Sequence, residues 1–188
     1  NIISNNSARR GGGMFINDGN INPRKNYFVN NIICNNTASV YGGGLYCDHI
    51  ICVNNLITNN TANYGGGIYC TDGTLNIHNS VLWGNRANNQ NNQLSIYGFD
   101  RVNFYNSVLE GGIDGIGSSS VVDYENMIET NPHFISPSQG AGYNYCGFNV
   151  NWALQAISPC IDGGTQREFY YDFEYPDYDI IDNDRVSM

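Results

Sequence analysis

The chain has 188 residues, of which 8 are basic and 17 acidic, so its formal net charge at pH 7 is −9. An acidic body of this kind offers no electrostatic surface for nucleic acid or for an anionic membrane. Its apolar runs are only a few residues long, so no segment predicts a membrane-spanning helix. The length predicts one domain that can bury a sizeable core.

Asparagine, glycine and serine interrupt the chain every few residues, which disfavours helices and favours short strands joined by turns. Four segments align on their asparagines: FVNNIICNNTA (28–38), CVNNLITNNTA (52–62), IHNSVLWGNRA (77–87) and FYNSVLEGG (104–112). The aligned asparagines are Asn30, Asn54, Asn79 and Asn106, which are 24, 25 and 27 residues apart. A period of this length is the signature of a solenoid, in which each repeat packs on the next.

Glycine triplets occur at 11–13, 42–44 and 65–67, and each is followed by a segment that reads as a strand. Stacked coils of a β-solenoid lie about 4.8 Å apart, so every corner must repeat the same backbone path. Glycine reaches positive φ without strain and leaves room for the coils above and below. The triplets therefore predict corners of the coil.

Two solenoids have a period near this length. A leucine-rich repeat needs a leucine scaffold and a helical or extended return, but the return stretch NNTANYGGG (59–67) is too rich in Asn and Gly for a helix. Coils made only of short strands and turns, stacked as a parallel β-helix, fit the sequence better. We predict an all-β chain, with β-helix coils over residues 1–130 and an irregular capping segment over 131–188.

The alternation of side chains along a strand predicts which residues face the core. In CVNNL (52–56) the inward set is Cys52, Asn54 and Leu56, while Asn55 faces solvent. The aligned asparagines are then expected to bond one another in an amide ladder, as stacked asparagines do in cross-β assemblies. That ladder comprises Asn30, Asn54, Asn79 and Asn106.

An aromatic residue follows the first inward residue of each strand after the corner. These outward aromatics are Phe15, Tyr46, Tyr69 and Tyr97, the last of which follows Ile96. They predict a stripe along the solenoid, and two roles are open for it. Cross-strand pairing of rings stabilises a sheet, and a row of exposed rings can also bind the apolar faces of sugars. An acidic, lysine-poor body favours neutral glycans over uronates.

The repeats and the C-terminal segment resemble a known family. NSVLWGNRA (79–87), YGGGIYC (64–70) and the Phe-x-x-Asn strings resemble right-handed parallel β-helix repeats of bacterial surface proteins, including polymorphic outer-membrane proteins. The tail, with NPHF (131–134), SPCIDGG (158–164) and DYDIIDNDRV (177–186), resembles the segment that closes such helices in secreted, surface-anchored bacterial proteins. The resemblance implies a right-handed β-helix in an extracellular or cell-surface setting.

Such helices serve as adhesins, passengers, sugar lyases and hydrolases, so the resemblance does not by itself give an activity. We expect a structural or adhesive surface module that presents side chains and loops to a glycan or to another surface protein. The alternative is a carbohydrate-active enzyme, either a polysaccharide lyase or a glycoside hydrolase. A glycosidase needs two carboxyl groups across a cleft, and the nearest candidates are Asp114 with Asp123 or Glu125.

The acidic, aromatic end of the chain is expected to wrap the last coil as a solvated loop. Its alternating carboxylates could instead hold calcium, which takes oxygen ligands. The calcium candidates are Asp177, Asp179, Asp182 and Asp184. No other cofactor is expected.

The chain begins without methionine and inside a repeat, so we expect a piece of a longer polypeptide. Its open first coil would then associate end to end with another chain. Three Asn-x-Ser/Thr sites, at Asn5, Asn35 and Asn59, would carry glycans if the producing cell glycosylates them.

Cysteine usage favours buried thiols over a metal site. Cys47 and Cys70 occupy equivalent inward positions and Cys52 stands where neighbouring repeats have apolar residues, so all three are expected to pack as small hydrophobic side chains. Cys34 is expected to face outward, and Cys146 and Cys160 could form a disulfide. No CxxC pair and no Cys–His cluster predicts a zinc site.

Overall fold

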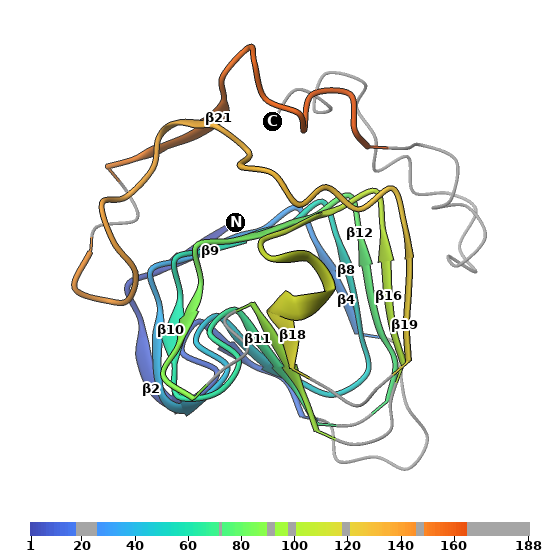
Figure 1. Ribbon diagram of the computed structural model, residues 1–188. Coiled ribbons are helices and arrows are strands. Elements are labelled where there is room, and N and C mark those ends of the chain that lie inside the picture. The colour runs from blue at the N-terminus through green and yellow to red at the C-terminus, as the bar shows by residue number, and fades with distance from the viewer. Residues whose placement is uncertain are drawn as a thin grey trace.

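The computed structural model describes residues 1–17, 26–71, 73–89, 93–97, 101–117, 121–145 and 149–164. Figure 1 looks along the axis of a solenoid in which equivalent strands of successive coils stack on one another. All four stacked sheets are parallel, and the one helix among the described residues is a short 3-10 turn, η1 (Gly112–Gly115). The predicted all-β parallel β-helix is confirmed.

Each coil contributes strands to sheets that we label A to D. Sheet A contains β1 (Ile2–Ser4), β5 (Ile32–Cys34), β9 (Leu56–Thr58), β13 (Val81–Trp83) and β17 (Val108–Leu109). Sheet B contains β2 (Ser7–Arg10), β6 (Thr37–Tyr41), β10 (Thr61–Ala62) and β14 (Arg86–Ala87). Sheet C contains β3 (Met14–Phe15), β7 (Leu45–Cys47), β11 (Ile68–Cys70), β15 (Leu94–Ile96) and β18 (Ile116–Gly117). Sheet D contains β4 (Asn26–Val29), β8 (Ile50–Val53), β12 (Leu75–His78), β16 (Arg101–Tyr105) and β19 (Val121–Glu125).

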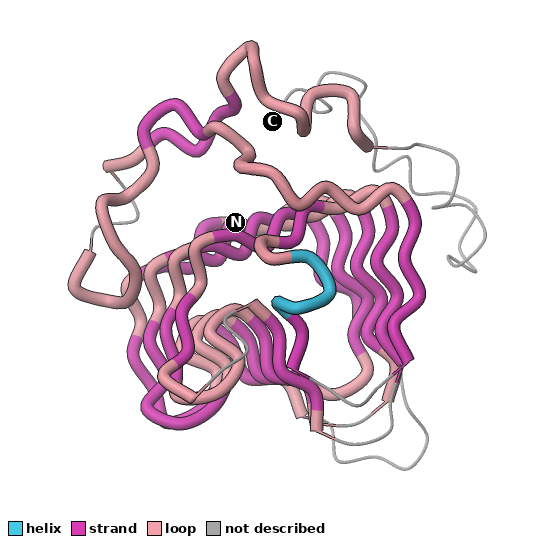
Figure 2. The backbone as a smooth tube through the Cα atoms, viewed as in Figure 1, coloured by secondary structure: helices cyan, strands magenta, loops and turns pink. Residues whose placement is uncertain are grey.

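The strand register in sheet A reproduces the predicted period. Ile32 pairs with Leu56, Leu56 with Val81, and Val81 with Val108. These steps are the same 24, 25 and 27 residues that separate the aligned asparagines. At the end of the stack, η1 lies over the opening of the coil, in the centre of the view in Figure 2.

The core is a column of apolar side chains that repeat from coil to coil. Sheet A supplies Ile33, Ile57, Leu82 and Leu109, and all four are fully buried. The inward thiols Cys47, Cys52 and Cys70 are also fully buried and unbridged, as predicted. Contact with the Cys70 thiol, together with burial, raises the pKa of Cys47 well above its ordinary value, and burial raises the pKa of Cys52 to about 12. Both thiols therefore remain protonated and act as small hydrophobic groups.

The prediction that Asn54 points inward and Asn55 outward is wrong. Asn54 has φ 51°, in the left-handed region, and its equivalents Asn30, Asn79 and Asn106 share that conformation. A left-handed residue turns the chain at a corner and shifts the strand alternation by one position. As a result Asn55 is buried, and Ile57 rather than Leu56 enters the core.

The buried polar ladder at the corner between sheets D and A therefore lies one residue after the predicted one. The Nδ2 group of Asn31 donates to Oδ1 of Asn55 at 3.2 Å, and the backbone N–H of Asn31 donates to the same oxygen at 3.0 Å. Asn55 N–H donates to the Ser80 hydroxyl, and Ser80 N–H to the Ser107 hydroxyl. Of the predicted ladder positions, Asn106 accepts from Asn126 in the next coil at 2.9 Å.

A second ladder, which the sequence analysis missed, follows the corner between sheets A and B. Asn36 donates from Nδ2 to Oδ1 of Asn60, and Asn60 donates likewise to Asn85, both at 3.0 Å. Each amide also donates to a main-chain carbonyl one coil away, Asn60 to Ile33 and Asn85 to Ile57. Asn36 and Asn60 thus have partners in the coils on either side, and Asn85 donates to Gln93 at the end of the column.

The glycine corners behave as predicted. The first glycine of each triplet has positive φ, for example 64° at Gly42. At Gly43 a Cβ would lie 2.3 Å from the carbonyl oxygen of Gly66 in the next coil, so the coils can stack there only without side chains.

We predict that Asn55→Ala destabilises the fold by ~1–3 kcal/mol, because it leaves the donors of Asn31 without their buried acceptor. Asn54→Gly is the matched control, since glycine adopts the left-handed conformation freely, and it should change stability by less than ~0.5 kcal/mol. Urea unfolding followed by circular dichroism measures both. Equal losses in the two variants would contradict the assignment of the ladder to Asn55.

Candidate functional site

The C-terminal arm (residues 131–145 and 149–164) leaves the coils and runs over the outer face of sheet A (Figure 1). Ile128 still forms a parallel bridge with Val108 before the arm begins. Within the arm, β20 (Phe134–Ser136) and β21 (Asn151–Leu154) pair as an antiparallel hairpin. Cys34 of sheet A, which was predicted to face outward, is fully buried and lies outside the core cluster.

Three left-handed asparagines hold the arm to the coils. Asn35 donates from Nδ2 to the Ser138 hydroxyl at 3.1 Å and to the Gly140 carbonyl at 3.0 Å. Asn59, one coil further on, donates to the same hydroxyl at 2.6 Å. Asn5 donates to the carbonyl of Tyr143 at 3.2 Å. These are the residues that sequence reasoning marked as glycosylation sites; their amides instead bind the arm, and Asn35 is fully buried.

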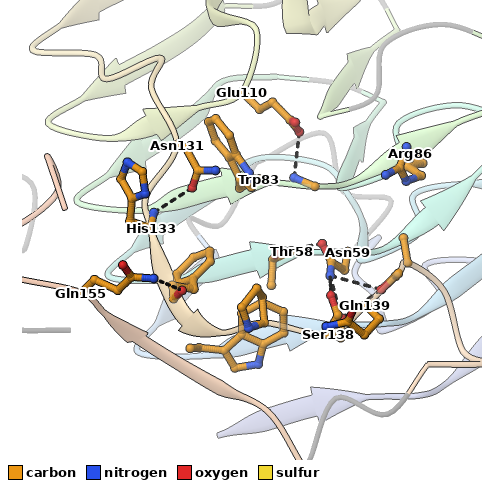
Figure 3. A pocket seen from close by; sticks show the side chains of 16 residues that line it. Thr58, Asn59, Trp83, Arg86, Glu110, Asn131, His133, Ser138, Gln139 and Gln155 are labelled. Atoms are coloured by element: carbon orange, nitrogen blue, oxygen red, sulfur yellow. Dashed lines mark hydrogen bonds between the residues drawn. The ribbon is translucent and has the colours of Figure 1, made fainter. Parts of the chain in front are cut away.

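Between the arm and sheet A lies a cavity of about 340 Å³ (Figure 3). Trp83 lines it from β13 and Trp152 from β21, and these are the two tryptophans of the whole chain. Phe134 packs edge-on against Trp152, with ring centroids 5.3 Å apart. Sequence reasoning did not single out this site, although two tryptophans in an otherwise repetitive chain were a signal that could have pointed to it.

The polar wall of the cavity is built around Glu110. Its Oε2 accepts a hydrogen bond from the Gly84 backbone at 2.8 Å and another from the Gln93 side chain at 2.5 Å. Gln93 in turn accepts from Asn85 at 2.8 Å, so Glu110 stands at the end of the second amide ladder. Arg86 lines the same cavity and is exposed to solvent. The carboxylate is therefore fixed in orientation by the coils themselves.

The predicted catalytic carboxylates are not arranged as a pair. Asp123 forms an ion pair with Arg101 at 2.8 Å on sheet D, and Glu125 is exposed on the same strand. Asp114 lies in η1 and instead lines a second cavity, of about 310 Å³, together with Glu110 and Arg86. Among the described carboxylates, Glu110 and Asp114 line one cavity together, and Glu110 was not among the predicted catalytic candidates.

The predicted aromatic stripe is present for three of its four members. Phe15 stacks on Tyr46 with centroids 4.7 Å apart and planes within 7°, and Tyr46 stacks on Tyr69 at 5.6 Å and 13°. Tyr97 is not in the stripe, because Leu94 rather than Ile96 pairs with Ile68 and the equivalent of Tyr69 is Ser95. The sequence alignment placed this coil two residues out of register.

The stacked rings have little free area for a ligand. Tyr46 is only 5% exposed and Tyr69 only 8%, against 50% for Phe15 at the end of the stack. Tyr41 covers Tyr69 from the side, with centroids 4.5 Å apart, and Arg10 lies over the Tyr46 ring at 5.7 Å. Because the ring faces contact one another, this arrangement suits stabilisation of the sheet better than stacking on sugars.

Burial, with smaller contributions from neighbouring tyrosines, raises the pKa of Tyr69 to about 12. The ordinary pKa of a tyrosine is about 10. Folding thus disfavours ionisation of the Tyr69 hydroxyl.

Several predicted features lie outside the described residues. They are Cys146 and the calcium candidates Asp177, Asp179, Asp182 and Asp184, and the calcium site stays a prediction. The predicted disulfide partner of Cys146, Cys160, is described and carries a free thiol, so that predicted pairing is wrong. In the ranges that the structure describes, no three His, Cys, Asp or Glu side chains form a group that could hold a metal ion. No helix within those ranges has the length and apolar character needed to cross a membrane.

A family model described as the Chlamydia polymorphic membrane protein repeat matches residues 32–48 and 56–71. Each match begins in sheet A and runs through the strands of sheets B and C in one coil. No curated protein and no solved structure matches the chain. These two coils are therefore similar to the polymorphic membrane protein repeat, whereas the resemblance drawn for the C-terminal segment stays a prediction.

We predict that Ser138→Ala loosens the arm, because it removes the hydroxyl that Asn35 and Asn59 share. Losing these bonds should accelerate amide hydrogen exchange at residues 138–145 about fivefold, corresponding to ~1 kcal/mol of local opening. Ser136→Ala, in the same arm but exposed, is the control. Unchanged exchange in Ser138→Ala would show that the arm is held by other contacts.

We predict that alkaline pH destabilises the fold through Tyr69. Between pH 10 and about 12 the unfolded chain loses the tyrosine proton while the folded chain keeps it, so the free energy of unfolding falls as pH rises through this window. Tyr69→Phe should lose this part of the pH dependence. Urea unfolding of both proteins from pH 9 to 12 measures the difference, and identical slopes would refute the prediction.

Proposed function

We propose that this chain is a rigid module of a bacterial cell-surface protein, which presents its loops and outer faces to a glycan or to a protein partner. The match of two coils to a repeat of polymorphic membrane proteins carries the proposal. Proteins that contain this repeat belong to the bacterial outer surface, and repeat modules of this shape offer long faces for binding.

The internal construction supports a rigid role. Two buried polar ladders cross the coils, and the aromatic stripe connects three of them. Because each coil is tied to the next by side chains as well as by strands, bending the solenoid would break several buried hydrogen bonds at once. Rigidity of this kind suits a module that holds a binding face at a fixed distance from its anchor.

The enzyme alternative has less support from the described residues. Asp123 is engaged by Arg101, and neither Asp123 nor Glu125 lines either cavity, so of the predicted catalytic residues only Asp114 lies in a cavity with a second carboxylate, Glu110. The aromatic stripe stays a possible glycan contact at its Phe15 end, where half of the ring is exposed.

The location can be tested on the bacterium that produces the protein. Antibodies raised against this chain should label intact cells as strongly as permeabilised cells, while antibodies against a cytoplasmic protein should label only the latter. Treatment of intact cells with an external protease should then remove the label. Labelling that requires permeabilisation would overturn the proposed surface role.

A further inference from the structure

We propose that the cavity between sheet A and the C-terminal arm binds a neutral saccharide. This inference deepens the proposed function by naming the chemistry of one partner and the site that holds it. It rests on the proposed function only for the place where the chain encounters the saccharide, which is the cell surface. Binding itself can be measured on the isolated chain.

The two tryptophans give the cavity its apolar surfaces. Trp83 reaches it from a coil and Trp152 from the arm, 69 positions later in the chain, and Phe134 adds a third ring. Sugar rings have apolar C–H faces that pack on aromatic rings, while their edges carry hydroxyls. A site that combines rings with a few placed polar groups is the usual form of a small-molecule site.

Glu110 supplies the hydroxyl acceptor. Both of the hydrogen bonds that fix its carboxylate, from Gly84 and Gln93, fall on Oε2. Among the described residues no donor occupies Oε1, and a carboxylate oxygen held in this way accepts strongly from a hydroxyl. Asn131 and Gln155 extend the polar wall from the arm (Figure 3).

Charge and size select the class of saccharide. The cavity is lined by one carboxylate, Glu110, and one guanidinium, Arg86, in a chain of net charge −9, so it offers no net positive charge to attract uronates or sialylated glycans. A volume of about 340 Å³ lies at the low end for ligand sites, which suits one or two sugar rings rather than a long enclosed chain. Neutral oligosaccharides with a terminal or branch unit in the cavity meet both conditions.

The walls are set before any ligand arrives. His133 is held at φ 52° by its own N–H, which donates to Asn131 at 2.8 Å, and by its carbonyl, which accepts from the Gln155 backbone at 2.9 Å. The Gln155 side chain also donates to the Phe134 carbonyl at 3.0 Å. A preformed wall reduces the entropy cost of binding.

Tryptophan fluorescence tests the proposal directly, because both tryptophans of the chain line this cavity. The purified protein is titrated with cellohexaose, mannohexaose and chitohexaose, and with trigalacturonate as the charged comparison. We expect a saturable change with at least one neutral sugar and a weaker response to trigalacturonate. No saturable change with any neutral sugar, or a preference for trigalacturonate, would overturn the proposal.

Variants then locate the site by calorimetry with the responding sugar. Trp83→Ala should weaken binding about tenfold or more, as removal of a central aromatic anchor usually does. Trp83→Phe, which disturbs packing less, should weaken it by a smaller factor, and circular dichroism melts check that both variants fold. Tyr124→Ala, an exposed ring on sheet D, is the control and should bind as the wild type does. Unchanged affinity in folded Trp83 variants would refute this site, whatever the cell-labelling result for surface location.

Discussion

The constraint on which this structure depends is that a polar corner must lie beneath the same polar corner of the next coil. An asparagine side chain carries both a donor and an acceptor, so a column of amides can continue through any number of coils, as it does from Asn36 through Asn60 to Asn85. Such buried groups are costly when unpaired and stabilising when every member has a partner. The stacked sheets therefore require the ladders as much as the apolar core.

The same corners also explain why asparagines occur in pairs. The first member, such as Asn35 or Asn59, takes the left-handed turn, and the second, Asn36 or Asn60, enters the ladder. Because the first member points away from the ladder, its amide is free to bind something outside the coil. Here that partner is Ser138 of the arm, so each pair serves both the interior and the outer face.

The sequence predicted the solenoid because the repeat period is visible in the asparagines and glycines. The prediction of which residues face the core failed where a left-handed residue shifts the alternation of side chains. The left-handed turn at Asn54 shifts the alternation by one residue, which a simple two-residue pattern cannot anticipate. Tyr97 was misplaced because its coil lacks the glycine triplet that marks the others. The position of the cavity was missed for a different reason: Asn35 and Ser138, whose contact positions the arm, are 103 residues apart.

The candidate site lies where the repeat departs from its own pattern. Trp83 stands where the preceding coils have Cys34 and Thr58, and Gln93 takes the stacking position after Gly67. Glu110 then ends the ladder, since a carboxylate can accept from Gln93 but cannot donate to a further coil. In regular coils each side chain is matched by its neighbours above and below. A binding site that occurs only once needs residues that the neighbouring coils do not repeat. In this fold such residues lie at the end of the ladder.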